Sequence, residues 1–245
     1  MIVKSEAIIL RTVNYSESSL IATAFTRQHG KIGLIAKGAR KPKNKFAAFL
    51  EPGQILETVY HYKGSRSVQT LSDLSYREKL HTLRTDIEKM ALVVITMEFC
   101  NQVLHDNEVN EPVFDFLMKL LPWIDHQNDV PGLMFPYIQI RMAKHLGIGL
   151  QILEEPNGRN GGYINIESGT ISESADDGNS IRLGEKQFWF ISRSLQAMNS
   201  SLFDVNLSSN EIRTLIGHLD SYFRYHIEGI KPRKSDSIFD QLLSS

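Results

Sequence analysis

The chain has 245 residues, 42% of them hydrophobic, which is enough for one large or two modest domains with proper cores. Its formal net charge of -1 conceals two different halves, because residues 1–80 carry 13 Lys+Arg against 6 Asp+Glu and residues 81–245 carry 14 against 22. A single cysteine, Cys100, excludes an intramolecular disulfide and a cysteine-rich zinc site. No signal peptide and no run of about 18 apolar residues occurs, so we expect a cytoplasmic protein, although an organellar or trimmed product would look the same.

The first part of the chain has the pattern of short antiparallel strands. Apolar and β-branched residues gather in five stretches, and residues that favour turns separate them. The predicted strands are residues 2–11, 18–27, 32–37, 54–62 and 67–76. Five strands in about 75 residues fit a small barrel, and we predict an OB-fold, which binds oligonucleotides across one face. An SH3-like barrel is the nearest alternative.

The most basic stretch of the sequence, residues 30–45, overlaps the third predicted strand and the loop after it. No Asp or Glu occurs from Ser18 to Leu50, so phosphates are the natural counter-charge for this stretch. An ordinary solvated loop is the alternative interpretation. The candidate phosphate contacts are Arg27, Lys31, Lys37, Arg40, Lys41, Lys43 and Lys45.

Two glycines, Gly30 and Gly38, mark the ends of the third predicted strand. We therefore expect Lys31 and Lys37 at defined positions, and residues 40–45 on a mobile loop that becomes ordered on DNA. If that loop is rigid and salt-bridged to the acidic helical half, the stretch is a domain clamp instead.

Aromatic side chains near the basic stretch could stack on unpaired bases. Core packing is the better interpretation for Phe25. For Phe46 and Phe49, which lie in the loop next to the cations, packing and stacking both remain open.

From about Leu80 the pattern becomes helical. The predicted helices are residues 85–105, 111–124, 133–146, 185–197 and 210–227. Residues 151–183 are rich in Gly, Asn, Ser and acidic residues, which predicts an inserted excursion with a short strand pair. The predicted fold is thus α+β with two domains: an OB-fold at residues 1–80, and a mainly α-helical domain at residues 81–245.

Motifs for catalysis are missing from the sequence. Gly30-Lys31 is followed by Ile32 rather than Ser or Thr, so a nucleotide-binding P-loop is not supported. His218 and His226 are eight residues apart, which is too wide for two helical imidazoles to share one metal. The apolar surroundings of Cys100 predict an inert core thiol. We therefore predict no enzyme, no metal, no cofactor and no small-molecule substrate.

Three segments resemble the N-terminal domain of the RecO family of bacterial recombination mediators: VNYSESSL at residues 13–20, FTRQHGK at residues 25–31 and AKGARKP at residues 36–42. The order and spacing of these segments are specific. Near the C-terminus, YFRYHI at residues 222–227, followed by Gly229 and Lys234-Ser235, resembles the final helix and tail of the same family.

The resemblance implies an OB-fold and a helical domain that bind single- and double-stranded DNA and anneal complementary strands in repair. It implies RecR, single-stranded-DNA-binding protein and the RecA pathway as partners, and a place on the nucleoid. Many relatives carry a four-cysteine zinc segment at about residues 153–174, where this chain has no cysteine, so zinc is not expected. A rival hypothesis is a protein-interaction adaptor whose acidic helical domain is the working surface. An enzyme of nucleic-acid metabolism would need a metal site or a carboxylate pair that the sequence does not offer.

Overall fold

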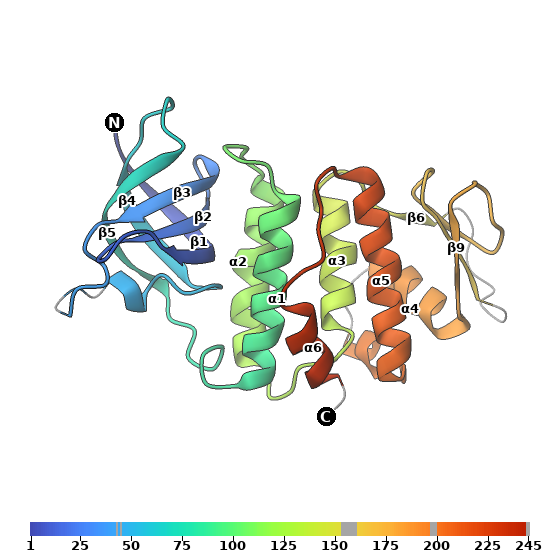
Figure 1. Ribbon diagram of the computed structural model, residues 1–245. Coiled ribbons are helices and arrows are strands. Elements are labelled where there is room, and N and C mark those ends of the chain that lie inside the picture. Colours follow the sequence, from blue (N-terminus) through green and yellow to red (C-terminus); the bar gives the residue numbers. More distant parts are fainter. Residues whose placement is uncertain (43, 45, 153–160, 197–199, 244–245) are drawn as a thin grey trace. The chain divides into compact units, whose positions relative to one another are not determined.

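The computed structural model describes residues 1–42, 44, 46–152, 161–196 and 200–243 (Figure 1). The chain forms two compact units, one of residues 1–128 and 232–239 and the other of residues 129–231 and 240–245. The predicted domain boundary at residue 80 falls in the connection between the last strand of the first unit and its first helix. That boundary stays a prediction.

The first unit begins with a closed five-stranded barrel. Its strands are β1 (Ile2–Asn14), β2 (Leu20–Thr26), β3 (Gly30–Ala36), β4 (Ile55–His61) and β5 (Val68–Glu78). They pair in the order β1-β2-β3-β5-β4, and β1 pairs with β4 to close the barrel. All pairs are antiparallel except β3 with β5. This OB-like barrel, followed by a helical region, confirms the predicted fold class.

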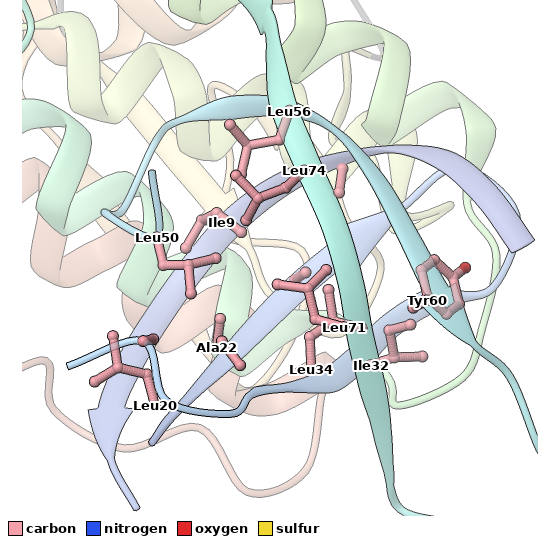
Figure 2. Packing of buried hydrophobic residues seen from close by; sticks show 14 of the residues in the cluster. Ile9, Leu20, Ala22, Ile32, Leu34, Leu50, Leu56, Tyr60, Leu71 and Leu74 are labelled. Atoms are coloured by element: carbon pink, nitrogen blue, oxygen red, sulfur yellow. The ribbon is translucent and has the colours of Figure 1, made fainter. Parts of the chain in front are cut away.

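Alternate residues of the strands fill the barrel interior, as the period of two in a strand requires. Figure 2 shows Tyr60 and Ile32 at one end of this cluster, and Leu20 at the other end with Leu50 from the β3–β4 loop. All four are buried, and Tyr60 is fully buried. Because the strands close into a barrel, helices, loops and ligands can contact only its outer face and its ends.

Two helices of the first unit follow the barrel, α1 (Ile87–Val103) and α2 (Glu111–His126), and α1 packs on β1. Asp86 caps α1 by accepting hydrogen bonds from two backbone N–H groups, as a helix N-terminus requires. Glu98 of α1 accepts the N–H groups of Lys234 and Ser235, both at 2.9 Å. These bonds fasten the returning segment 232–239, which holds the first residues of α6 (Asp236–Leu242), to the first unit.

The second unit combines helices with a small sheet. Its helices are α3 (Met134–His145), α4 (Glu185–Gln196) and α5 (Ser209–His226), and α3 packs against both others. The strands are β6 (Gln151–Ile152), β7 (Gly162–Asn165), β8 (Thr170–Ser172) and β9 (Ser180–Leu183), in the order β6-β8-β7-β9. Short 3-10 turns occur at Phe46–Ala48 in the first unit and at Ser200–Asp204 in the second.

The predicted strand pair is present as β7 and β8, but it belongs to a larger sheet that the sequence did not predict. The amide of Asn165, a fully buried residue, donates to Ser172 Oγ at 2.8 Å and to Asp176 Oδ2 at 3.1 Å. Its Oδ1 accepts from Asp176 N at 3.0 Å and from Ser180 Oγ at 2.6 Å. This polar network ties the turns of the sheet together.

Across the part of the chain that the structure describes, no helix has both the length and the apolar composition to span a membrane.

Candidate nucleic-acid interface

The loop that follows β3 presents the predicted cations on the surface of the barrel. Lys37, Arg40 and Lys41 are all exposed. Arg40 is fastened to the β1–β2 turn, because its backbone N–H donates to Ser18 O and its guanidinium Nη1 donates to Ser16 O, both at 2.9 Å. Two loops that are separate in sequence therefore form one surface, with an anchor at Arg40 that the sequence did not predict.

The exposed cations of this surface lack local counter-charges. Among the described residues, no carboxylate forms an ion pair with Lys37, Arg40 or Lys41. Lys43 and Lys45 lie outside the described residues. The phosphates of a nucleic acid can neutralise three such cations on one loop.

An exposed aromatic residue, Tyr15, lies in the same β1–β2 turn, with 63% of its surface accessible. Sequence reasoning missed it as a candidate because it stands within a polar turn and away from the basic stretch. A tyrosine ring that is free on one face can stack on an unpaired base.

Beside this turn the outer face of the barrel is apolar and partly open. Val13 pairs with Ile21, and Ile21 with Ile35, so these three side chains lie in a row across β1, β2 and β3. Val13 is exposed and the other two are partly exposed. In OB-folds the face of strands 2 and 3, with the loops on either side, is the surface that holds oligonucleotides. We name the surface formed by Tyr15, Lys37, Arg40, Lys41 and this apolar row the loop face.

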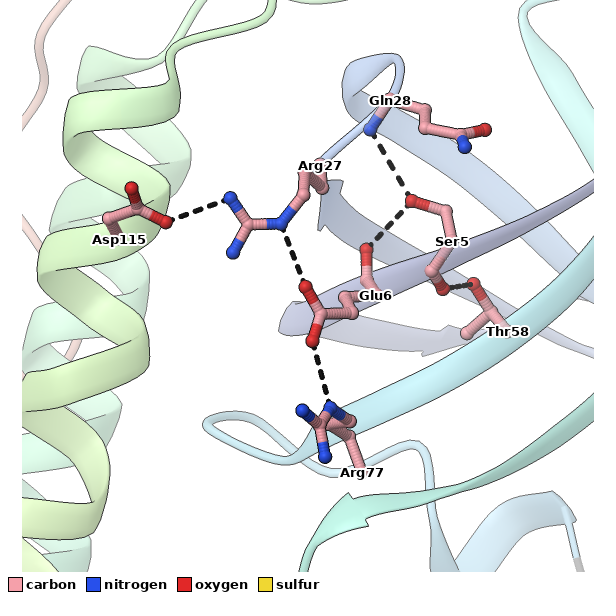
Figure 3. Close-up of polar contacts among 7 residues, drawn as sticks. All are labelled: Ser5, Glu6, Arg27, Gln28, Thr58, Arg77 and Asp115. Carbon is pink, nitrogen blue, oxygen red and sulfur yellow. Dashed lines mark hydrogen bonds and ion pairs between the residues drawn. The ribbon is translucent and has the colours of Figure 1, made fainter.

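Arg27, another predicted phosphate contact, is engaged within the protein (Figure 3). Its Nε donates to Glu6 Oε2 at 2.7 Å, and its Nη1 donates to Asp115 Oδ1 on α2 at 2.8 Å. The guanidinium also lies 4.4 Å from the centre of the Phe114 ring. Hydrogen bonds from Arg77 and Arg27 hold the pKa of Glu6 below its usual value, although burial of the carboxylate opposes the shift.

Lys31 is engaged in the same way, and only 11% of its side chain is exposed. Its Nζ donates to the carbonyl oxygen of Asn101 at 2.9 Å and lies 3.1 Å from Asp106 Oδ1. Arg27 and Lys31 thus fasten the β2–β3 hairpin to α1, to α2 and to the loop between these helices. DNA contact by these two residues stays a prediction.

The other aromatic candidates are occupied by packing. Phe46 and Phe49 are partly buried against the barrel core, and the ring of Phe49 lies 4.4 Å from that of Tyr76. Phe25 is fully buried as predicted, but it packs outside the barrel, with its ring centre 5.4 Å from that of Phe114.

Nothing in the described part of the chain forms a group of three or more His, Cys, Asp or Glu side chains that could hold a metal ion. Cys100 is buried, as expected for a core thiol, and burial raises the pKa of its thiol to about 12, which disfavours the reactive thiolate. His226 Nε2 lies 2.8 Å from the carbonyl oxygen of Ile166, a contact within the protein. What the site offers chemically is charge, stacking and apolar surface.

Comparison with known proteins assigns both parts of the chain to one family. The model described as "Recombination protein O N terminal" matches residues 1–79, and "Recombination protein O C terminal" matches residues 84–236. A protein of Chloroherpeton thalassium named "DNA repair protein RecO" is 30% identical over 261 residues, covering 99% of this chain and 100% of that protein.

Other relatives of the same name align over a shorter region. The protein of Salinibacter ruber is 32% identical over 147 residues, which cover 60% of this chain and 56% of the relative. The protein of an Exiguobacterium species is 31% identical over 148 residues, which cover 60% of this chain and 58% of the relative. In these alignments the chain spans a little more than half the length of the relatives that it matches.

Proposed function

Because the chain belongs to the RecO family of DNA repair and recombination proteins, we propose that it is a non-enzymatic mediator that binds single- and double-stranded DNA and anneals complementary strands. In this proposal it acts with RecR on strands coated by single-stranded-DNA-binding protein and helps to load RecA. A domain of residues 1–80 carries the DNA contacts.

The observation that carries the proposal is the set of cations on the loop face. Lys37, Arg40 and Lys41 are exposed, close together in sequence and without carboxylate partners among the described residues. Phosphate contacts from such a loop carry no sequence preference, as a protein that works on many sequences requires. Lys43 and Lys45 extend the same run along the chain.

The physical route to annealing needs no covalent chemistry. Two single strands repel each other through their phosphates, and cations on the protein lower that repulsion while they release condensed counterions. Tyr15 and the apolar row beside it give unpaired bases a surface to rest on. Base pairing between the two strands then selects the complement.

Arg27 and Lys31 have a different place in this proposal. Their ion pairs with Asp115 and Asp106 would have to break before either cation reached a phosphate. We infer that they act as positioning residues, which fix the β2–β3 hairpin so that the loop after β3 leaves the barrel at a defined place.

Fluorescence anisotropy with labelled single-stranded and duplex oligonucleotides tests the proposal. The wild-type protein is expected to bind both, and the double variant Arg40→Glu/Lys41→Glu is expected to bind both more weakly. Lys119→Glu, which changes an exposed lysine of α2, is the matched control. If the wild-type protein binds neither oligonucleotide at low salt, the proposed function is wrong.

A further inference from the structure

An open pocket of about 530 Å³ lies where β5 runs into the connection to α1, within the first unit. Cavities of this size commonly hold one small ligand. Its lining residues are Gln54, Tyr76, Lys79, Leu80, His81, Arg84 and Thr85.

The charged side chains of the lining are basic, and no carboxylate is among them. Lys79 is exposed, and within the described residues it has no acidic partner. Arg84 Nη2 lies 2.7 Å from Glu51 Oε1, but both side chains are more than two-fifths exposed, so this pair can exchange for another anion at little cost. The cavity therefore favours an anionic ligand.

Gln54 adds a hydrogen-bonding side chain that has no partner among the described residues. Only 2% of Gln54 is exposed, and its backbone N–H and C=O are paired with Glu51 O and Ile9 N. Its side-chain amide makes no hydrogen bond to any residue that the structure describes. An amide without a protein partner in the lining of a pocket is available to a ligand that both donates and accepts.

Tyr76 supplies an aromatic surface in the same lining. One side of its ring is supported by Phe49, with ring centres 4.4 Å apart and planes 32° from parallel. The ammonium of Lys79 lies 6.0 Å from the centre of the Tyr76 ring. A base that stacks on the ring would displace this exposed ammonium, which could then hold the phosphate attached to the base.

Asp125 of α2 holds in place the connection that lines this pocket. Its carboxylate accepts the backbone N–H groups of His81, Thr82 and Leu83 at 3.1, 2.7 and 3.0 Å. Three hydrogen bonds to one carboxylate fix the backbone of the connection, so the cavity is formed before any ligand arrives.

We propose that this cavity takes one unpaired nucleotide of a bound single strand. Tyr76 stacks on the base, the amide of Gln54 pairs with the base edge, and Lys79 and Arg84 hold the adjacent phosphate. The inference rests on the proposed function, that this chain binds DNA. It adds a preference for single strands, because a base that is paired in a duplex cannot enter the cavity.

The test compares a single-stranded oligonucleotide with the duplex of the same sequence at one salt concentration, again by anisotropy. Tyr76→Leu and Gln54→Met are expected to weaken binding of the single strand by at least about fivefold, the lower end for loss of one stacked base, and to leave duplex binding unchanged. Lys79→Ala changes an exposed residue, so it should fold even if Tyr76→Leu or Gln54→Met does not, and it too should weaken binding of the single strand. Lys119→Ala, also at an exposed position, is the control and should bind as the wild type does. Gln54→Met should not lower the melting temperature of the free protein, because it removes an unpaired amide.

Each alternative result has a definite meaning. If the cavity variants bind the single strand as the wild type does, while Arg40→Glu/Lys41→Glu binds it weakly, the cavity proposal is refuted and the proposed function stands. Equal losses on single strand and duplex would make the cavity a plain phosphate contact, which also refutes it. Thymidine monophosphate distinguishes the source of the ligand, because tight binding of the free nucleotide would overturn the assignment to a strand. A wild-type protein that binds no DNA refutes the proposed function itself.

Discussion

Replacing Lys37, Arg40 and Lys41 together by alanine should change how DNA binding depends on salt. All three side chains are exposed and lack carboxylate partners among the described residues, so the fold should tolerate the change. Among the described residues, the one side-chain hydrogen bond that the variant loses is the 2.9 Å bond from Arg40 to Ser16 O. The variant therefore isolates the phosphate contacts of the loop face.

The size of the effect follows from counterion release. Each phosphate contact on a single strand contributes about 0.7 to the slope of log affinity against log salt, so three contacts contribute about 2.1. Between 50 mM and 200 mM salt, a fourfold rise, the wild-type protein should lose about 18-fold more affinity than the variant.

The assay is fluorescence anisotropy of a labelled single-stranded oligonucleotide at several salt concentrations, with circular dichroism to show that the variant is folded. Lys119→Ala should keep the wild-type slope. If the triple variant has the same slope as the wild type, the loop face does not contact phosphates and the reasoning from its unpaired cations is refuted.

Three further predictions concern the first unit. Gly30 has a φ of 63°, and a Cβ at this position would lie 1.8 Å from Glu108 O. Gly30→Ala should therefore destabilise the unit by more than the strain of about 1–3 kcal/mol expected for a positive φ alone. Urea denaturation measures the loss, and a near-neutral result would contradict the close approach. Phe25→Ala should lower the free energy of unfolding by about 3–5 kcal/mol, and a loss below about 1 kcal/mol would show that the ring is not buried between barrel and helix. Burial lowers the pKa of His29 below its usual value of 6.5, so the unfolded chain binds more protons and the stability should fall as the pH drops through 6.5. His29→Asn should flatten this pH dependence in denaturation curves measured at pH 5 to 7.5. If the variant keeps the wild-type pH dependence, groups other than His29 cause it.

The strand pattern of the barrel could be predicted because each strand alternates between a packed inner face and an outer face. The largest departure is in β1, which extends to Asn14 rather than ending at Arg11, whereas β3 begins two residues earlier and β5 ends two residues later than predicted. The register of β1 shifts between Ile9 and Arg11, and this bulge interrupts the alternation on which the prediction depends.

The partners of individual charges could not be predicted, because they lie far apart in the chain. Arg27 and Asp115, for example, are 88 positions apart. Local sequence shows that Arg27 belongs to a basic region, but only the fold shows that its charge is neutralised within the protein. The same limit applies to Gln54, whose burial beside a cavity depends on residues of β5 and of the connection to α1.

The sheet of the second unit was missed in part for a related reason. Its strands have two to four residues, too few for a periodic signal. Asn165 and Asp176 hold the turns together by hydrogen bonds, and such bonds leave no pattern in a polar sequence.

Annealing tests the central claim most directly. Two complementary oligonucleotides, each coated with the cognate single-stranded-DNA-binding protein, are mixed with and without this protein, and duplex formation is followed by energy transfer between labels on the two strands. We predict that the wild-type protein accelerates annealing, that Lys119→Ala does so equally, and that the triple variant of Lys37, Arg40 and Lys41 does so much less. If the wild-type protein accelerates annealing of neither coated nor naked strands, the account of this chain as a DNA-annealing mediator is contradicted.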